Sequence, residues 1–366
     1  MKRRTFLAAG ASLVVPGAAR AAGWDPAKIE TAADVMNEWV KDGRVAGATI
    51  LVTQGSQRFT RNFGTATGSD PVFLLASITK PMTAAAVMTL VEAGALSLDD
   101  KVTKFFPQFR GEGRETITIR HILTHTGGLP DMLADDEALR ARRATLADYR
   151  DGAFKAPLKF RPGSSYSYSS MGILLSAEIA QKITGTPFDK FVEAKLFRPL
   201  GMSKTSFGLG GRAKSSTVAS QAAPAMTPDG KRTWNNWNWN SDYWRGLGAP
   251  WGGALGPASD IARFYNEFIA TRGRILKPAS ERLMITNQSP PGVAASGLGF
   301  DLPPKVGAPM CGPRTFGHNG STGTLSWADP DSGAICVILT TLYAAAVKPH
   351  PMQLASNLIG QAVAKS

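Results

Sequence analysis

The stretch Leu74-Leu75-Ala76-Ser77-Ile78-Thr79-Lys80 places a hydroxyl and an amine three residues apart, where a helix is expected to begin. Positions three apart share one face of a helix. Residues 81–94 are nearly free of charge, which is typical of a helix that is buried on every side. Pro81 fits only the first turn of a helix, and Gly94 is a common terminator. The helix should therefore start close to Ser77, whose oxygen then lies at the positive end of the helix dipole.

Ser77 and Lys80 have the spacing of a nucleophile and its base. A serine hydroxyl needs a neighbouring base at neutral pH, and a lysine can serve only if burial or a nearby cation lowers its pKa. Ser-x-x-Lys alone is a weak signal, because many helices carry it with a solvated lysine. Here the apolar run behind Lys80 leaves no solvated alternative and favours the catalytic interpretation.

The first 21 residues have the features of a secretory signal. Lys2-Arg3-Arg4-Thr5-Phe6-Leu7 is a basic start, an apolar run follows it, and Ala19-Arg20-Ala21 offers a small-residue cleavage site. The paired arginines are typical of a twin-arginine signal, which exports a folded protein in a bacterium. We therefore expect residues 1–21 to be removed and the mature protein to be periplasmic, without a stable membrane span. An uncleaved anchor is the alternative, although the apolar run is short for a bilayer.

Composition narrows the classes of partner. The formal net charge is +13, and removal of residues 1–21 leaves about +9. The basic groups are scattered, without a basic run that carries interleaved aromatic residues, so we expect no nucleic-acid partner. Two cysteines, Cys311 and Cys336, are too few for a disulfide scaffold. They could pair in the periplasm, but the apolar run around Cys336 favours a buried free thiol.

Strand patterns occur near both ends of the chain. A helical pattern over residues 29–40 precedes two strand patterns, at 45–53 and 57–63. Three more strands are expected at 314–320, 324–328 and 334–342, before a closing helix at 352–363. We therefore predict an α+β fold, in which helices flank an antiparallel sheet built from residues 24–80 and 290–366. Residues 81–289 would form an inserted, mostly helical domain that carries active-site loops.

Two further features allow more than one interpretation. His121 and His125 are four apart on an expected helix, but no acidic residue lies between them and no third ligand is evident. Structural histidines are favoured, and no metal site is predicted. Five of the eight tryptophans gather between Trp234 and Trp251 in a loop-like stretch without helical period. Trp237 and Trp239 in this stretch are candidates for a cleft wall that contacts substrate, with a small satellite core as the alternative.

Three motifs in order resemble those of the serine β-lactamase and penicillin-recognising superfamily, in particular its class C-like branch of β-lactamases, D-alanyl-D-alanine carboxypeptidases and esterases. Ser77-Ile78-Thr79-Lys80 matches Ser-x-x-Lys, Tyr168-Ser169-Ser170 matches Tyr-x-Asn, and His318-Asn319-Gly320 matches the Lys-Thr-Gly or His-x-Gly strand motif. The resemblance covers most of residues 26–364. It implies the β-lactamase/transpeptidase-like fold.

The resemblance also implies roles for these residues. Ser77 would form an acyl-enzyme, and Lys80 and Tyr168 would move the proton, with either of them as the base. The backbone N–H groups of Ser77 and Ser321 would form the oxyanion hole. His318, Asn319, Gly320 and Ser170 would contact the substrate. The mechanism needs no cofactor.

Two departures from the family pattern point towards an esterase. Ser170 replaces an asparagine that helps lactamases to hold the lactam amide, and His318 replaces a lysine that would meet a substrate carboxylate. At neutral pH a histidine is mostly uncharged. We predict an exported serine hydrolase acting on small esters or amides, or on cell-envelope peptide. D-alanyl-D-alanine carboxypeptidase or weak β-lactamase activity is the alternative within the class, and an inactive envelope-binding homologue the alternative outside it.

Overall fold

The computed structural model describes residues 23–221, 225–226, 232–233 and 238–363. The expected signal peptide and Trp237 lie outside these ranges. The strands are β1 Gly47–Gln54, β2 Gln57–Gly64, β3 Phe73–Leu74, β4 Ser206–Phe207, β5 Ala225–Met226, β6 Arg232–Thr233, β7 Ala254–Gly256, β8 Phe316–Gly320, β9 Thr324–Asp329 and β10 Ala334–Thr340. The helices are α1 Pro26–Lys41, α2 Thr79–Glu92, α3 Val102–Phe105, α4 Ile119–Leu123, α5 Asp136–Ala141, α6 Leu146–Lys155, α7 Ser170–Thr184, α8 Phe188–Val192, α9 Arg198–Leu200, α10 Asp242–Leu247, α11 Ala258–Ala270, α12 Pro278–Met284 and α13 Pro351–Val363. Short turns of other helix types are η1 Ala76–Ile78, η2 Arg114–Thr116, η3 Glu193–Phe197 and η4 Lys214–Ser216.

A five-stranded antiparallel sheet joins the two ends of the chain. Its strand order is β2-β1-β10-β9-β8, so β1 from the first part of the chain pairs with β10 from the last part. Ile50 lies opposite Ile338, which in turn lies opposite Leu325. All residues of β9 and β10 are buried, as expected for central strands covered on both faces. The predicted α+β fold with a sheet from both termini is confirmed.

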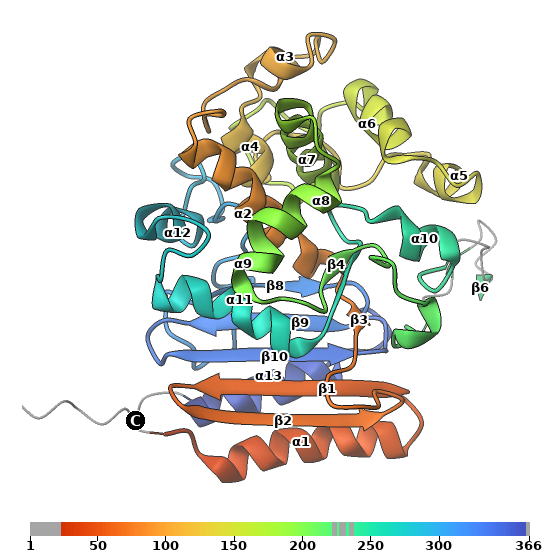
Figure 1. Ribbon diagram of the computed structural model, residues 1–366, viewed down its shortest axis with the longest axis vertical. Helices are drawn as coiled ribbons and strands as arrows, with labels where there is room; N and C mark the ends of the chain where they lie inside the picture. Colours follow the sequence, from red (N-terminus) through yellow and green to blue (C-terminus); the bar gives the residue numbers. More distant parts are fainter. Residues whose placement is uncertain (1–22, 222–224, 227–231, 234–237, 364–366) are drawn as a thin grey trace, which may run out of the picture.

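Helices cover the two faces of this sheet unequally. In Figure 1, α1 and α13 pack together beside the sheet, α11 lies across β9 and β10, and most of the other helices lie beyond the β8 edge. A small core of Ile29, Met36, Trp327 and Ile359 fills the first interface. A much larger core under α2, α7 and α11 fills the second and continues into the helical region. The predicted domain boundaries at residues 80/81 and 289/290 stay a prediction.

Helix α2 lies in the middle of the larger core, as its uncharged sequence predicts. Eleven of its fourteen residues are buried, Lys80 and Pro81 among them. Pro81 is the third residue of the helix, where no intrahelical partner for its nitrogen is lost. Gly94 follows the last turn with a φ of +70°. The helix end is thus set by a residue that tolerates the left-handed conformation.

The tryptophan-rich stretch differs in part from the expectation of an irregular loop. Residues 242–247 form helix α10, whose first turn is capped by Ser241 accepting a hydrogen bond from the Trp244 amide. Gly248 ends it in the left-handed conformation. A helix of six residues is too short to show a hydrophobic period, so only the Ser-Asp start and the glycine marked it.

Candidate active site

The side chains of Ser77 and Lys80 meet where strand β3 passes into helix α2. Ser77 lies in the turn η1, and the Lys80 Nζ donates a hydrogen bond of 3.0 Å to its Oγ. A second hydrogen bond, of 2.8 Å, runs from Lys80 Nζ to the Trp251 carbonyl. Lys80 has no exposed surface, and this burial lowers its pKa from 10.5 to about 7. The lysine can therefore exist as a neutral base at physiological pH.

The backbone around Ser77 is held by the end of strand β8, the turn that follows it and the first residue of β9. Ala76 has a φ of +48°, a conformation that side chains rarely adopt and that surrounding contacts must maintain. Thr322 and Thr324 donate hydroxyl hydrogen bonds to the carbonyls of Leu74 and Leu75. A Cβ at Gly320 would lie 2.6 Å from the Leu75 carbonyl oxygen. Only glycine allows this approach, which explains the glycine of the His-x-Gly motif.

Tyr168 reaches the same point from the loop before α7. Its ring centroid lies 4.6 Å from the Lys80 Nζ, and its hydroxyl interacts with Ser77. Burial raises the pKa of Tyr168 well above 10, although the hydrogen bond with Ser77 opposes the rise. Ser169 caps α7 by accepting a hydrogen bond from the Gly172 amide. The structure thus brings the three predicted catalytic side chains together.

His318 lies beside Tyr168, with ring centroids 5.9 Å apart. The ring is buried, and burial lowers its pKa below the usual 6.5, even though the Asp301 carboxylate opposes this. The Asp301 Oδ2 lies 3.9 Å from Nε2, and this contact is an ion pair only if the ring is protonated. Because desolvation is the largest influence on the pKa, we regard the ring as neutral at pH 7.

Ser170 does not present a free hydroxyl to the cleft. Its Oγ donates a hydrogen bond of 2.6 Å to the Asp131 Oδ1, and its backbone N–H donates to the same oxygen at 3.0 Å. In place of an amide, this position therefore fixes a carboxylate at the cleft wall.

Most of these groups line one cavity of about 500 Å³, whereas Lys80 is not among its lining residues. Ser77, Tyr168, Ser321 and Trp239 line it, so the two amides expected for the oxyanion hole come from walls of the same cleft. The other predicted residues that line it are Ser170, His318, Asn319 and Gly320. Trp244 and Trp251, from the tryptophan-rich stretch, also line the cavity. The sequence interpretation missed four charged lining residues, namely Asp131, Asp136, Arg140 and Asp301.

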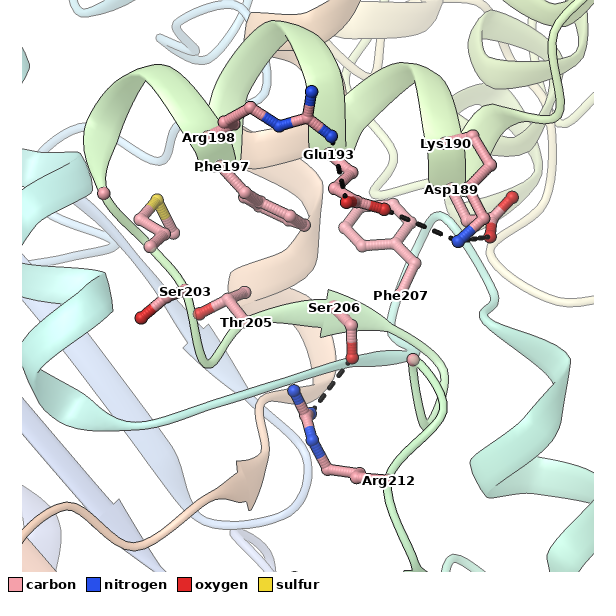
Figure 2. Close-up of a pocket in the computed structure, with 13 residues that line it drawn as sticks. Asp189, Lys190, Glu193, Phe197, Arg198, Ser203, Thr205, Ser206, Phe207 and Arg212 are labelled. Atoms are coloured by element: carbon pink, nitrogen blue, oxygen red, sulfur yellow. Dashed lines mark hydrogen bonds and ion pairs between the residues drawn. The ribbon is translucent and has the colours of Figure 1, made fainter.

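A second cavity, of about 360 Å³, lies between β4 and the helical segment from α8 to α9 (Figure 2). Its polar groups are tied to each other: Arg212 donates to the Ser206 Oγ, and Ser206 donates to the Gly208 carbonyl. None of the described residues predicted for the site lines it. A hydroxyl held in this way has no base beside it, so we place no chemistry here.

The two neighbouring histidines make local structural contacts. His121 caps α4 together with Thr118, and the His125 Nδ1 accepts a hydrogen bond of 3.2 Å from the Ser169 amide. Burial lowers the pKa of both rings. Within residues 23–363, apart from the segments that the structure does not describe, no three His, Cys, Asp or Glu side chains are grouped as metal ligands. In the same part of the chain, no helix is long and apolar enough to cross a bilayer. Cys311 and Cys336 are both free thiols.

The sequence of this chain matches one family model and is similar to several known proteins. A family model described as Beta-lactamase matches residues 31–355. Esterase EstB of Burkholderia gladioli is 33% identical over 196 residues, which are 47% of this chain and 50% of that protein, so the match spans only half of its length. A putative D-alanyl-D-alanine carboxypeptidase of Escherichia coli K12 is 29% identical over 298 residues, 72% of this chain and 66% of that protein.

Solved structures share the fold. EstCE1, described as a hydrolase with promiscuous acyltransferase activity, has a TM-score of 0.74 at 19% identity, and the superposition covers 91% of this chain and 99% of EstCE1. The D-amino acid amidase of Ochrobactrum anthropi has a TM-score of 0.71 at 22% identity, with 92% and 98% covered. At such identities the likeness concerns the arrangement of the chain alone.

Proposed function

The chain belongs to the Beta-lactamase family, and from this premise we propose that it is an exported serine hydrolase that cleaves carboxylic esters through an acyl-enzyme on Ser77. The observation that carries the proposal is the hydrogen bond of 3.0 Å between a buried Lys80 amine and the Ser77 hydroxyl. Burial of that amine makes it a base of the strength that neutral pH requires.

In the first step, the Ser77 Oγ attacks the carbonyl carbon of the ester while its proton passes to the neutral Lys80 amine. The pKa of about 7 for Lys80 and the much higher pKa of Tyr168 support this division of roles. At pH 7 Tyr168 keeps its proton and is a donor, not a base. The tetrahedral oxyanion would accept hydrogen bonds from the backbone N–H groups of Ser77 and Ser321.

When the intermediate collapses, the bond between the carbonyl carbon and the alcohol oxygen breaks. The alkoxide takes a proton from the Tyr168 hydroxyl, which Lys80 reprotonates, and the alcohol leaves. Water then attacks the acyl-enzyme, giving its proton back along the same pair of residues. The free carboxylic acid and the Ser77 hydroxyl are restored, so the cycle needs no metal or organic cofactor.

The walls of the cleft support an ester or an amide substrate over a lactam. The Ser170 hydroxyl donates its hydrogen bond to Asp131, and a serine side chain has no amide group. His318 is a buried neutral ring and not the fixed cation that would hold a lactam carboxylate. The same observations weaken the D-alanyl-D-alanine carboxypeptidase alternative, which a relative's name suggests, because that substrate ends in a carboxylate. We further propose export to the periplasm by residues 1–21.

The test is paired kinetics of the mature protein and Ser77→Ala on a series of 4-nitrophenyl esters and on nitrocefin. We expect Ser77-dependent turnover of the esters and little hydrolysis of nitrocefin. Efficient nitrocefin hydrolysis would favour the lactamase alternative, and ester turnover that survives in Ser77→Ala would refute the proposed nucleophile.

A further inference from the structure

The tautomer of His318 is determined by its backbone neighbour. The Nδ1 of the ring lies 2.7 Å from the Asn319 backbone oxygen. A carbonyl oxygen can only accept, so Nδ1 must carry the proton and donate it. In the neutral ring Nε2 is then an unprotonated acceptor. No hydrogen-bond partner for this buried nitrogen exists among the described residues.

The group nearest to Nε2 is another acceptor. The Asp301 Oδ2 lies 3.9 Å away, and Asp301 lines the cleft with His318. Among the described residues, no lysine or arginine nitrogen lies within 4.0 Å of this carboxylate. Two cations, Lys80 and Lys305, interact electrostatically with both groups. Lys80 donates its hydrogen bonds to the Ser77 Oγ and the Trp251 carbonyl. Lys305 donates to the Ala295 carbonyl and packs on the Tyr166 ring. Two acceptors that face each other at this distance require a donor between them.

The side chains that line the rest of the cleft also carry a net negative charge. Among the described residues, three carboxylates line it, those of Asp131, Asp136 and Asp301, against one guanidinium, that of Arg140. Arg140 is bonded to Asp136 at 2.9 Å and packs on the Trp244 ring, with 4.4 Å between Cζ and the ring centroid. The chain as a whole carries a net charge of +13, so this concentration of negative charge is local to the cleft.

We propose that the site selects esters that carry a primary ammonium group, whose N–H donors bridge the His318 Nε2 and the Asp301 carboxylate. The inference rests on the proposed function and names its substrate class. The position where lactamases present a donor to a substrate carboxylate here presents acceptors to a substrate cation. The positive charge also compensates the carboxylates of the cleft, whereas a substrate carboxylate would meet repulsion from them.

Two matched ester series test the proposal, because the side of the ester that meets His318 depends on how the substrate lies. The acyl series consists of the benzyl esters of 3-aminopropanoate, butanoate and succinate, which place a cation, a methyl group or a carboxylate at the same position. The alcohol series consists of the butanoates of 4-(aminomethyl)benzyl, 4-ethylbenzyl and 4-(carboxymethyl)benzyl alcohol. Rates are followed by pH-stat at pH 7.5.

In at least one series, kcat/KM for the ammonium ester should exceed that of the neutral ester by about ten- to hundredfold, the range expected for hydrogen bonds to a charged group. The carboxylate ester should be the poorest substrate. The preference should decrease as the pH falls, because protonation of His318 converts Nε2 into a donor; Asp301, Lys80, Lys305, His125 and Tyr168 are the titratable groups that face this ring.

Variants show whether Asp301 and His318 cause the preference for the ammonium ester or whether the preference is a general effect of the protein's charge. Asp301→Asn should lower the ratio of kcat/KM between ammonium and neutral esters about tenfold, and His318→Lys should favour the carboxylate ester. Asp42→Asn is the matched control, because it removes one exposed carboxylate that lies outside the cleft and, in the part of the chain that the structure describes, forms its ion pair with Arg44. It should leave the ratio as it is in the wild type.

The results distinguish a failure of the proposed substrate preference from a failure of the proposed function. If the neutral esters are hydrolysed in a Ser77-dependent manner but neither series prefers the ammonium ester, the inference is wrong and the proposed function stands. If no ester is hydrolysed at all, both are wrong. A preference that survives unchanged in a folded Asp301→Asn protein would also overturn the inference.

Discussion

Replacement of Lys80 by methionine should make the protein more stable and inactive. The lysine is held without exposure, and its pKa falls from 10.5 to about 7. Since one pKa unit corresponds to about 1.4 kcal/mol, keeping Lys80 charged at pH 7 or below costs the folded state about 5 kcal/mol. Methionine fills similar space but leaves the Trp251 carbonyl without its donor, at a cost of about 1–3 kcal/mol. The net gain is about 2–4 kcal/mol.

The gain should depend on pH with a defined sign. Between pH 7 and 10.5 the unfolded chain holds a proton on Lys80 that the folded protein has lost, so the stability of the wild type rises with pH in this window. The advantage of Lys80→Met should therefore shrink by about 1.4 kcal/mol per pH unit above pH 7. Activity should fall by about 10²–10⁴, the usual contribution of a general base.

Urea unfolding at pH 6.5 and 9, together with kinetics on a neutral ester, measures both effects. Lys41→Met at an exposed position of α1 is the control and should change the free energy of unfolding by less than about 0.5 kcal/mol at either pH. A stability difference that is equal at both pH values, or a variant that keeps its activity within tenfold, would refute the assignment of Lys80 as a buried base.

Three further changes test other parts of the molecule. Tyr168→Phe should lower kcat by about 10²–10⁴ with little change in KM, because it removes the proton donor to the leaving group, whereas Tyr166→Phe in the same loop should not; equal losses in both would contradict the assignment. Trp239→Ala should raise KM for esters with bulky acyl groups, because Trp239 lines the cleft; unchanged kinetics would make it structural. Glu281→Gln should remove a loss of stability that the wild type shows as the pH rises from 4.5 to 7, since burial and Glu267 raise the pKa of Glu281 from 4.5 to about 7. Urea midpoints at pH 5 and 8 measure this difference, and a wild type that is equally stable at both would refute it.

The elements that the sequence predicted well are those with a strong local signal. Helix α2 is apolar on all sides, and its proline and glycine mark both ends. Helix α13 runs from Pro351 to Val363, one residue longer than the predicted range 352–363. The central strands β9 and β10 are short apolar runs on either side of a turn of Asp, Pro and Gly. In each case, neighbouring residues alone determine the conformation.

The site could be predicted only where a motif marks it. Ser77, Lys80 and Tyr168 stand in recognisable patterns, and the structure brings them together. Asp301 and Asp131 stand in none, because their importance arises from contacts with His318 and Ser170, which are 17 and 39 residues away in the chain. The proton position on His318 likewise follows from one backbone carbonyl, and no pattern of residue types contains that information.

The most direct test of the central claim is the mass of the protein after reaction with a fluorophosphonate. The account predicts a single covalent adduct, located on Ser77 by peptide mapping, whose rate of formation rises with an apparent pKa of about 7 as Lys80 loses its proton. Ser77→Ala should form none. An adduct on another residue, or no adduct on a folded wild-type protein, would contradict the claim that Ser77 and Lys80 form a nucleophile and its base.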